Sequence, residues 1–217
     1  MHQLNIVLSG QRAFGCAVYE MLRRHPHCKL TAVYAPPGDS LHALATRAGV
    51  ETSPAGTLRA TNIPPNTDLI VAAHSHDYIG AETRNRLRIG AIGYHPSLLP
   101  RHRGRDAVKW TIRMRDLVAG GTVFWLVDNV DAGPIAAQEW CWVSPGEDAH
   151  SLWRRALFPM GVRLLAQVLD DIAGGRVVQR DQDEKVATWE PALDSIPLYR
   201  PELIQIGTFP PGFNIIK

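Results

Sequence analysis

The sequence has few cysteines and no long apolar run. Its three cysteines, Cys16, Cys28 and Cys141, are an odd number without the spacing of metal ligands, so we expect reduced thiols rather than a disulfide framework. No run approaches the roughly 18 apolar residues that a membrane span needs, and the N-terminus shows no signal-peptide pattern. We therefore expect a cytoplasmic protein that has no membrane partner.

A strong excess of basic residues is also missing. The net charge is +2, from 23 basic and 21 acidic side chains, and the one dense basic stretch is Arg101–Arg105. This balance does not favour a nucleic-acid partner. The 217 residues are 45% hydrophobic, which is enough to bury a substantial core.

Apolar runs and helical periodicities alternate through the first half of the chain. Strand-like runs end in turn residues, and the segments between them carry apolar residues at helical spacing. The expected strands cover residues 4–8, 30–35, 68–73 and a run ending at 95, and the expected helices follow them, around 14–22, 41–48 and 80–88. This alternation predicts an α/β fold with a doubly wound, mostly parallel sheet, in which ligands bind beyond the carboxyl ends of the strands.

The second half has a different pattern. A helix over 106–115 is expected to precede a hairpin of strands 122–127 and 135–143, which are joined by the acidic turn sequence 128–134. A long helix should start at Asp148 and kink or split at Pro159. We expect a catalytic domain over residues 1–178, followed by an extended or partly disordered C-terminal extension over 179–217, because that segment is rich in proline.

Two polar side chains stand at the ends of apolar segments. His95 ends a strand and is followed by Pro96, and Asp131 lies in a turn flanked by glycine and proline. If the fold brings them together, the carboxylate would fix the tautomer of the imidazole and favour a charged donor for a developing oxyanion. Ordinary polar surface contacts are the alternative explanation for both residues.

Other candidate sites are weaker. Ser97 has no nucleophile-elbow sequence around it. His74, His76 and Asp77 could suggest a metal, but neighbouring residues on a strand point to opposite faces, and no third ligand has suitable spacing. The turn from Ser9 to Gly15 lacks the glycine spacing of a dinucleotide-binding loop. We therefore expect no metal site.

Two motifs in the chain resemble the folate-dependent formyltransferase family. They are His95-Pro96-Ser97-Leu98-Leu99-Pro100 and Val130-Asp131-Ala132-Gly133-Pro134-Ile135. The resemblance covers roughly residues 4–178. Within that family the chain is similar to the hydrolase domain of 10-formyltetrahydrofolate dehydrogenase, through Gly10-Gln11, Phe14-Gly15, Val18-Tyr19, Tyr94–Gly104, Phe124-Trp125 and Leu157-Phe158-Pro159.

The resemblance implies a cleft that binds 10-formyltetrahydrofolate as formyl donor, with His95 and Asp131 as the catalytic pair. It further implies that the pterin lies between the segment after the third strand and the acidic turn. The implied cofactor-binding residues are His74, Ser75, His76, Tyr78, Ile79, Asp128, Asn129, Val130 and Gly133.

One position departs from the family pattern. Transferases that formylate a purine precursor or an initiator tRNA carry an asparagine two residues before the histidine, where this chain has Gly93. Loss of one oxyanion donor typically costs about 10² to 10³ in rate. Gly93 is compatible with hydrolysis, with an unusual acceptor, or with replacement of the donor by another group such as Thr122 or a backbone amide.

The favoured hypothesis is formyl transfer to a small amine, such as an amino sugar or a biosynthetic intermediate. The glycine-rich phosphate loop of glycinamide ribonucleotide formyltransferases is not matched, and we expect neither a tRNA-binding barrel nor an aldehyde dehydrogenase domain after Val178. The alternatives are a 10-formyltetrahydrofolate hydrolase and a non-catalytic folate-binding protein. A homodimer is a candidate assembly, with the proline-rich extension as its arm or as a partner-binding segment.

Overall fold

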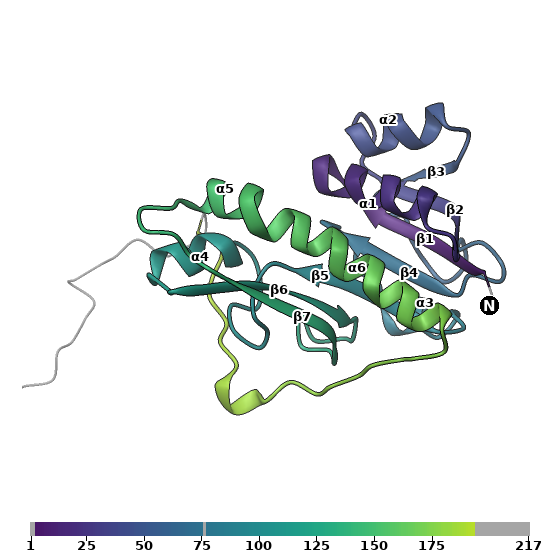
Figure 1. The fold of residues 1–217 in the computed structure, drawn as a ribbon. Helices are drawn as coiled ribbons and strands as arrows, with labels where there is room; N and C mark the ends of the chain where they lie inside the picture. Colours follow the sequence, from purple (N-terminus) through teal and green to yellow (C-terminus); the bar gives the residue numbers. More distant parts are fainter. Residues whose placement is uncertain (1–2, 76, 194–217) are drawn as a thin grey trace, which may run out of the picture.

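A computed structural model describes residues 3–75 and 77–193, which fold around one seven-stranded sheet (Figure 1). The strands are β1 (Leu4–Gly10), β2 (Cys28–Ala35), β3 (Glu51–Pro54), β4 (Leu69–Ala73), β5 (Gly90–His95), β6 (Val118–Trp125) and β7 (Ile135–Trp142). The helices are α1 (Arg12–Arg24), α2 (Ser40–Arg47), α3 (Ala81–Arg84), α4 (Ala107–Arg113), α5 (Ala149–Leu152) and α6 (Phe158–Ala173), with a π-helical turn (Trp153–Leu157) and a 3-10 turn (Glu184–Val186).

The strand order is β3-β2-β1-β4-β5-β6-β7. All pairs from β3 to β5 are parallel, whereas β5 with β6 and β6 with β7 are antiparallel. This confirms the predicted mostly parallel, doubly wound sheet. The chain leaves β1 toward β2 and returns on its other side as β4, so the switch point of the topology lies between β1 and β4. Ligand sites in such sheets form beyond the carboxyl strand ends at this point.

The core has two layers, because successive residues of a strand point to opposite faces. In β1, Ile6 and Leu8 join the larger cluster with α1 and α6, whereas Val7 joins a smaller cluster on the other face. That smaller cluster is closed by Leu58 and Ile63 from the loop between β3 and β4. The second face of the sheet is thus covered partly by irregular chain.

Three sequence expectations differ from the structure. The strand β3 was not expected, because its short, polar sequence pairs only along one edge of β2. The helix expected over 80–88 is reduced to α3, in which only Thr83 is buried. The strand expected over 122–127 begins earlier, at Val118, so that Gly120 and Gly121 lie within β6.

Close packing explains these two glycines. A Cβ atom at Gly121 would come within 2.2 Å of the Tyr94 hydroxyl oxygen, and one at Gly120 within 2.4 Å of the Leu98 side chain. The strand therefore continues through both positions because only glycine leaves room for the residues packed on it.

The long C-terminal helix begins as expected at Asp148, whose side chain accepts from the Ser151 backbone amide in a reciprocal capping box. Pro159 is accommodated in the first turn of α6, directly after the π-helical turn, in which the Phe158 amide donates to the Trp153 carbonyl five residues earlier. The helix is therefore interrupted by an irregular turn just before Pro159. Its two parts, α5 and α6, still follow one another along one direction (Figure 1).

After α6 the chain runs back along the sheet as an extended segment, drawn in yellow-green in Figure 1. The indole nitrogen of Trp125 donates to the Val178 carbonyl, and Arg180 forms an isolated antiparallel bridge with Ile135. Residues 194–217 lie outside the described part of the chain. The division into a domain up to residue 178 and an extension stays a prediction.

All three cysteines are free thiols, and burial raises the pKa of Cys28 to about 12. Within residues 3–75 and 77–193, no helix is both long and apolar enough to cross a membrane.

Candidate active site

A cleft of about 820 Å³ opens beyond the carboxyl ends of β4 and β5. Its walls come from the segment after β4, the loops after β5 and β6, and the start of α4. The polar and aromatic residues that line it include Arg12, His74, Ser75, Asp77, Tyr78, His95, Arg105, Asp106, Lys109, Asp128, Asn129, Asp131 and Trp189. The cleft therefore lies where the topology of the sheet predicts a ligand site.

His95 is the last residue of β5 and is only 7% exposed. Its Nε2 atom lies 2.6 Å from the His102 carbonyl oxygen. Because a carbonyl only accepts, Nε2 must carry a proton, and the geometry assigns this tautomer. The Nδ1 atom is then the one free to gain or lose a proton, and it lies 3.5 Å from Oδ2 of Asp131.

Asp131 lies in the loop between β6 and β7, with a φ of 52° in the left-handed region. Asparagine and aspartate tolerate this conformation better than most residues. Its Oδ2 accepts a hydrogen bond of 2.7 Å from the Gly104 amide. The carboxylate is thus held between the loop after β5 and the imidazole, in a position to stabilise a positive charge on His95.

Cationic and anionic side chains both line the cleft. Lys109 forms a 2.8 Å ion pair with Asp106, and this hydrogen bond is the main cause that lowers the pKa of the Asp106 carboxyl. Asp128, which also lines the cleft, pairs with Arg84 at 2.7 Å. The cleft can therefore receive a ligand with groups of either sign.

Most of the predicted cofactor-binding residues line the cleft. His74, Ser75, Tyr78 and Ile79 come from the segment after β4, and Asp128, Asn129 and Val130 from the acidic loop. His76 lies outside the described residues. Exposed apolar side chains among them, such as Tyr78 (68%) and Val130 (57%), could cover a flat aromatic ligand. Their binding role stays a prediction.

Gly133 is not part of the cleft lining. A Cβ atom at this position would come within 1.7 Å of the Trp125 carbonyl oxygen, so the residue allows the loop to pack against the end of β6. The structure gives Gly133 a role in backbone packing rather than in contact with a ligand.

The sequence did not predict the hydrogen bonds of a small polar network on the cleft wall. The hydroxyl of the fully buried Ser9 lies 2.6 Å from the Ser75 hydroxyl and donates to Asp77 at 2.5 Å. Asp77 also accepts from the Gly56 amide. The signal in the sequence was a serine at the end of β1 beside the switch point, but its partners are 66 and 68 positions away.

Trp189, which also lines the cleft, was missed as well. It comes from the C-terminal extension, forms an isolated parallel bridge with Arg103 and packs on Gly104. Nothing in the local sequence distinguishes this tryptophan from the others, and only the return of the chain after α6 brings it to the cleft.

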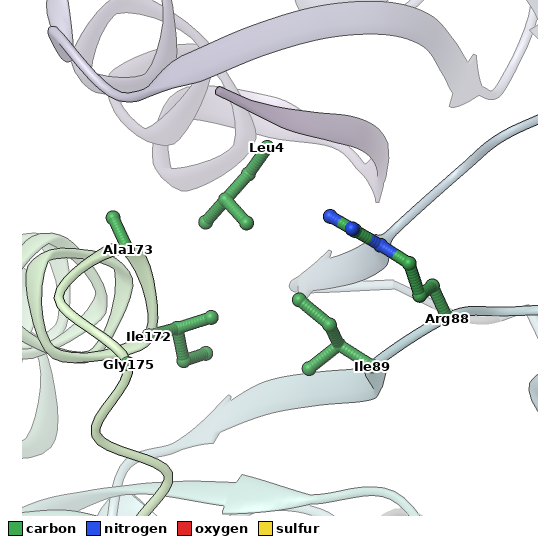
Figure 2. Close-up of a pocket in the computed structure, with 6 residues that line it drawn as sticks. All are labelled: Leu4, Arg88, Ile89, Ile172, Ala173 and Gly175. Atoms are coloured by element: carbon green, nitrogen blue, oxygen red, sulfur yellow. The ribbon is translucent and has the colours of Figure 1, made fainter. Parts of the chain in front are cut away.

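A second, smaller hollow of about 340 Å³ lies near the beginnings of β1 and β5. Figure 2 shows its lining, in which Leu4, Ile89 and Ile172 face one another and Arg88 is the one charged side chain drawn. Arg88 is bound to Asp68 at 2.5 Å. The hollow has no acid–base pair, so we place the chemistry in the larger cleft.

No group of three or more His, Cys, Asp or Glu side chains among residues 3–75 and 77–193 is arranged to hold a metal ion. Independence of a metal stays a prediction.

A comparison with known protein families shows to which family this chain is related. A sequence profile described as formyl transferase matches residues 54–169. The chain belongs to the formyl transferase family. This confirms the resemblance drawn from the motifs around His95 and Asp131.

Individual members of the formyl transferase family support the assignment. The mitochondrial 10-formyltetrahydrofolate dehydrogenase of Mus musculus is 34% identical over 204 residues, which are 87% of this chain and 22% of that protein. The chain thus spans about a fifth of the length of this curated relative.

Solved structures share the fold. Glycinamide ribonucleotide transformylase 1 from Symbiobacterium toebii superposes with a TM-score of 0.70 at 21% identity, covering 84% of this chain and 95% of that one. An N-formyltransferase from Helicobacter canadensis, in complex with folinic acid and dTDP-3-aminofucose, gives 0.72 at 14% identity, covering 89% and 72%.

Gly93, the departure from the formyl transferase pattern, lines the cleft beside His95. A Cβ atom there would lie 3.1 Å from Cδ2 of Leu126. Thr122 cannot replace the missing donor, because it is fully buried, does not line the cleft and donates to the Ser97 carbonyl at 2.7 Å. That alternative from the sequence is therefore wrong.

Proposed function

We propose that this chain binds 10-formyltetrahydrofolate in the cleft and transfers the formyl group to a small amine. The observation that carries the proposal is the His95–Asp131 pair, with Nδ1 and Oδ2 3.5 Å apart in the wall of a cleft of about 820 Å³. Membership of the formyl transferase family supports the donor. The residues from His74 to Ile79 and from Asp128 to Val130 would hold the pterin.

The reaction is an acyl transfer. The amine nitrogen attacks the formyl carbon, and the C–N bond forms as the carbonyl oxygen becomes an oxyanion. Protonated His95 donates from Nδ1 to this oxygen, and Asp131 stabilises the imidazolium. The attacking nitrogen loses one proton through a water held by Asp131, the bond to the folate nitrogen breaks, and that nitrogen takes a proton. The products are the formylated amine and tetrahydrofolate.

For the acceptor class we favour an amino sugar or a similarly small amine. The structurally similar enzyme from Helicobacter canadensis was solved with dTDP-3-aminofucose. The α1 N-terminus in this chain is already occupied, since the Arg12 amide donates to both carboxylate oxygens of Asp39, at 2.9 and 3.1 Å. A phosphate on the acceptor would therefore have to bind elsewhere than at this helix end.

Hydrolysis is the second candidate, and Gly93 is the observation that favours it. A glycine beside His95 provides no side-chain donor, and the Leu126 side chain lies 3.1 Å from the position that a Cβ would take. In that reaction water attacks in place of the amine, and formate and tetrahydrofolate are released. We also propose a cytoplasmic location and a homodimeric assembly, although neither transfer nor hydrolysis depends on them.

The test uses 10-formyltetrahydrofolate carrying ¹³C in the formyl group. Wild type is compared with His95→Ala, and with His150→Ala as a control for an exposed histidine outside the cleft. We expect release of tetrahydrofolate by wild type and by the control, and a loss of about 10² to 10⁴ in rate in His95→Ala.

The fate of the label separates the candidate functions. Labelled N-formyl product with an amine panel supports transfer, and labelled formate without amine supports hydrolysis. Folate binding by wild type without any product, with or without amines, would contradict both and leave a folate-binding protein.

A further inference from the structure

The C-terminal segment 180–190, which we call the strap, contacts both loops that carry the candidate catalytic pair. Arg180 pairs with Ile135 through backbone bonds of 2.7 and 3.0 Å at the end of the loop that holds Asp131. Farther along, the Thr188 amide donates to the Pro100 carbonyl at 3.0 Å, in the loop after His95. The strap therefore connects two loops that also meet directly, through the hydrogen bond from the Gly104 amide to Asp131.

Gln182 is the strap residue that reaches Asp131. Its Nε2 donates to the carbonyl oxygens of Asp131 and Gly133, at 2.9 and 2.7 Å. Its Oε1 accepts from Nε and Nη2 of Arg103, at 3.1 and 2.7 Å. All four contacts use the amide in one orientation, with the nitrogen toward two acceptors and the oxygen toward two donors.

Arg103 lies between the two backbone groups that hold the catalytic pair. Its predecessor His102 provides the carbonyl that accepts from His95, and its successor Gly104 provides the amide that donates to Asp131. Arg103 is only 8% exposed, so the surrounding residues leave its side chain few other conformations. The contacts form a closed ring from Gln182 through Arg103 and Gly104 to Asp131 and back.

The backbone of Asp131 needs such support. Its φ of 52° is sparsely populated for residues other than glycine. A left-handed residue in a loop keeps its conformation only where surrounding bonds determine it, and the Gln182 amide holds the carbonyls at Asp131 and two residues later.

We propose that Gln182 is a positioning residue that sets the distance between Asp131 and His95. This inference rests on the proposed function of the pair but concerns a residue outside the segment 54–169 that the family profile matches. Without the two amide donors, the Asp131 loop would relax and the carboxylate would leave the imidazole. Formyl transfer or hydrolysis would then slow at the chemical step while the folate still binds.

The decisive variant is Gln182→Glu, which keeps the shape of the side chain and its acceptor toward Arg103. It replaces the two donors with an oxygen that faces two carbonyls. We expect kcat to fall about 10- to 100-fold, with the KM for 10-formyltetrahydrofolate within about twofold of wild type, because misplacement of a catalytic group by about 1 Å costs a factor of this size.

Glu184→Gln is the matched control. Glu184 also lies on the strap and binds Arg103, at 2.6 and 2.8 Å, and this contact lowers the pKa of its carboxyl. Among the described residues, its side chain forms no hydrogen bond with the Asp131 loop. We expect kcat within about twofold of wild type. An equal fall of kcat in both variants would overturn the proposal, since it would show a general effect of the strap.

Gln182→Met provides a second variant of similar shape, without donors and without a new charge, in case Gln182→Glu does not fold. An unchanged kcat in either folded variant would overturn the proposal. A readout independent of turnover is the ¹⁵N resonance of the His95 ring, assigned by its loss in His95→Ala. We expect it to shift in Gln182→Glu and Gln182→Met but not in Glu184→Gln.

This resonance separates the two proposals. If wild type shows no turnover while the ring resonance still responds to Gln182, the formyl reaction is wrong and the positioning role holds. If wild type turns over and neither kcat nor the resonance responds to Gln182, the positioning role is wrong and the reaction stands.

Discussion

The parallel part of the sheet and the antiparallel part bury different kinds of side chain. Among the described residues up to the end of α3, Asp68 is the one Asp, Glu, His, Lys or Arg residue that is buried as a whole, although the side chain of His25 is also only 6% exposed. From β5 onward the buried ones are His95, His102, Arg103 and Glu190. The difference shows that the part before β5 buries mainly apolar side chains, whereas the part from β5 onward buries more ionisable residues, among them the proposed catalytic His95.

The buried charges of the antiparallel part are paired with one another and with loop backbone. His102 is 3% exposed, with Nε2 2.7 Å from Asp116 and Nδ1 3.1 Å from Glu190. Burial of charge lowers stability unless partners compensate it. The carboxylates of Asp116 and Glu190 compensate part of this cost, although Nδ1 of His102 and one carboxylate oxygen of Glu190 are buried without a hydrogen-bond partner among the described residues.

Substitution of Asp131 should have the largest effect on the reaction. In Asp131→Asn the amide keeps the shape of the side chain but cannot stabilise a charged imidazole, so we expect kcat to fall by about 10³, or roughly 4 kcal/mol in activation free energy. Steady-state tetrahydrofolate release measures it. A melting temperature close to that of wild type is the expected accompanying result, and a rate within threefold of wild type would contradict the role of the pair.

Substitution in the scaffold should change stability and leave the reaction unchanged. Leu69 at the start of β4 is fully buried in the larger core cluster. We expect Leu69→Ala to lower the free energy of unfolding by about 3 kcal/mol, since the lost contacts are accompanied by a cavity. Urea unfolding gives this value, and kcat measured where the variant is folded should equal that of wild type. A large fall of kcat would show that the two parts are not separate in function.

Substitution of Gly93 should have the smallest effect on the reaction. Gly93 lies on β5, where the parallel part of the sheet meets the antiparallel part, so it tests whether a donor at this border contributes to the reaction. In Gly93→Asn we expect an increase of about 10-fold in formyl release over Gly93→Ala, because an amide beside His95 adds a donor for the oxyanion. The alanine variant controls for the contact with Leu126, which lies 3.1 Å from the Cβ position. Equal rates in the asparagine and alanine variants would mean that the oxyanion does not form near this side chain.

Much of the parallel part could be predicted from the sequence, because each element has its own local pattern. The strands β1, β2 and β4 are buried apolar runs, and α1 has its buried residues at Phe14, Val18 and Leu22. The failures are instructive. The strand β3 is polar and owes its form to pairing with β2, and β6 runs through two glycines because neighbouring side chains occupy the space that a Cβ would need.

The candidate site was predicted only in part. His95 and Asp131 could be singled out because turn residues follow a strand end or surround an acidic residue. Trp189, Gln182 and the hydrogen-bond partners of Ser9 could not, since each depends on contacts between residues that are many positions apart in the chain. Gly133, expected in the binding site, has the more local task of allowing close backbone packing.

The sequence by itself determined the alternation of strands and helices, the end of β5 at His95 and the turn that holds Asp131. Periodicity and the restricted dihedral angles of proline and glycine act over a few residues and can be recognised without a partner. Only the tertiary structure decided that Nδ1 and Oδ2 of this pair lie 3.5 Å apart and that the strap passes over both loops. Those contacts depend on strand register and on the closure of long loops, which no local pattern specifies.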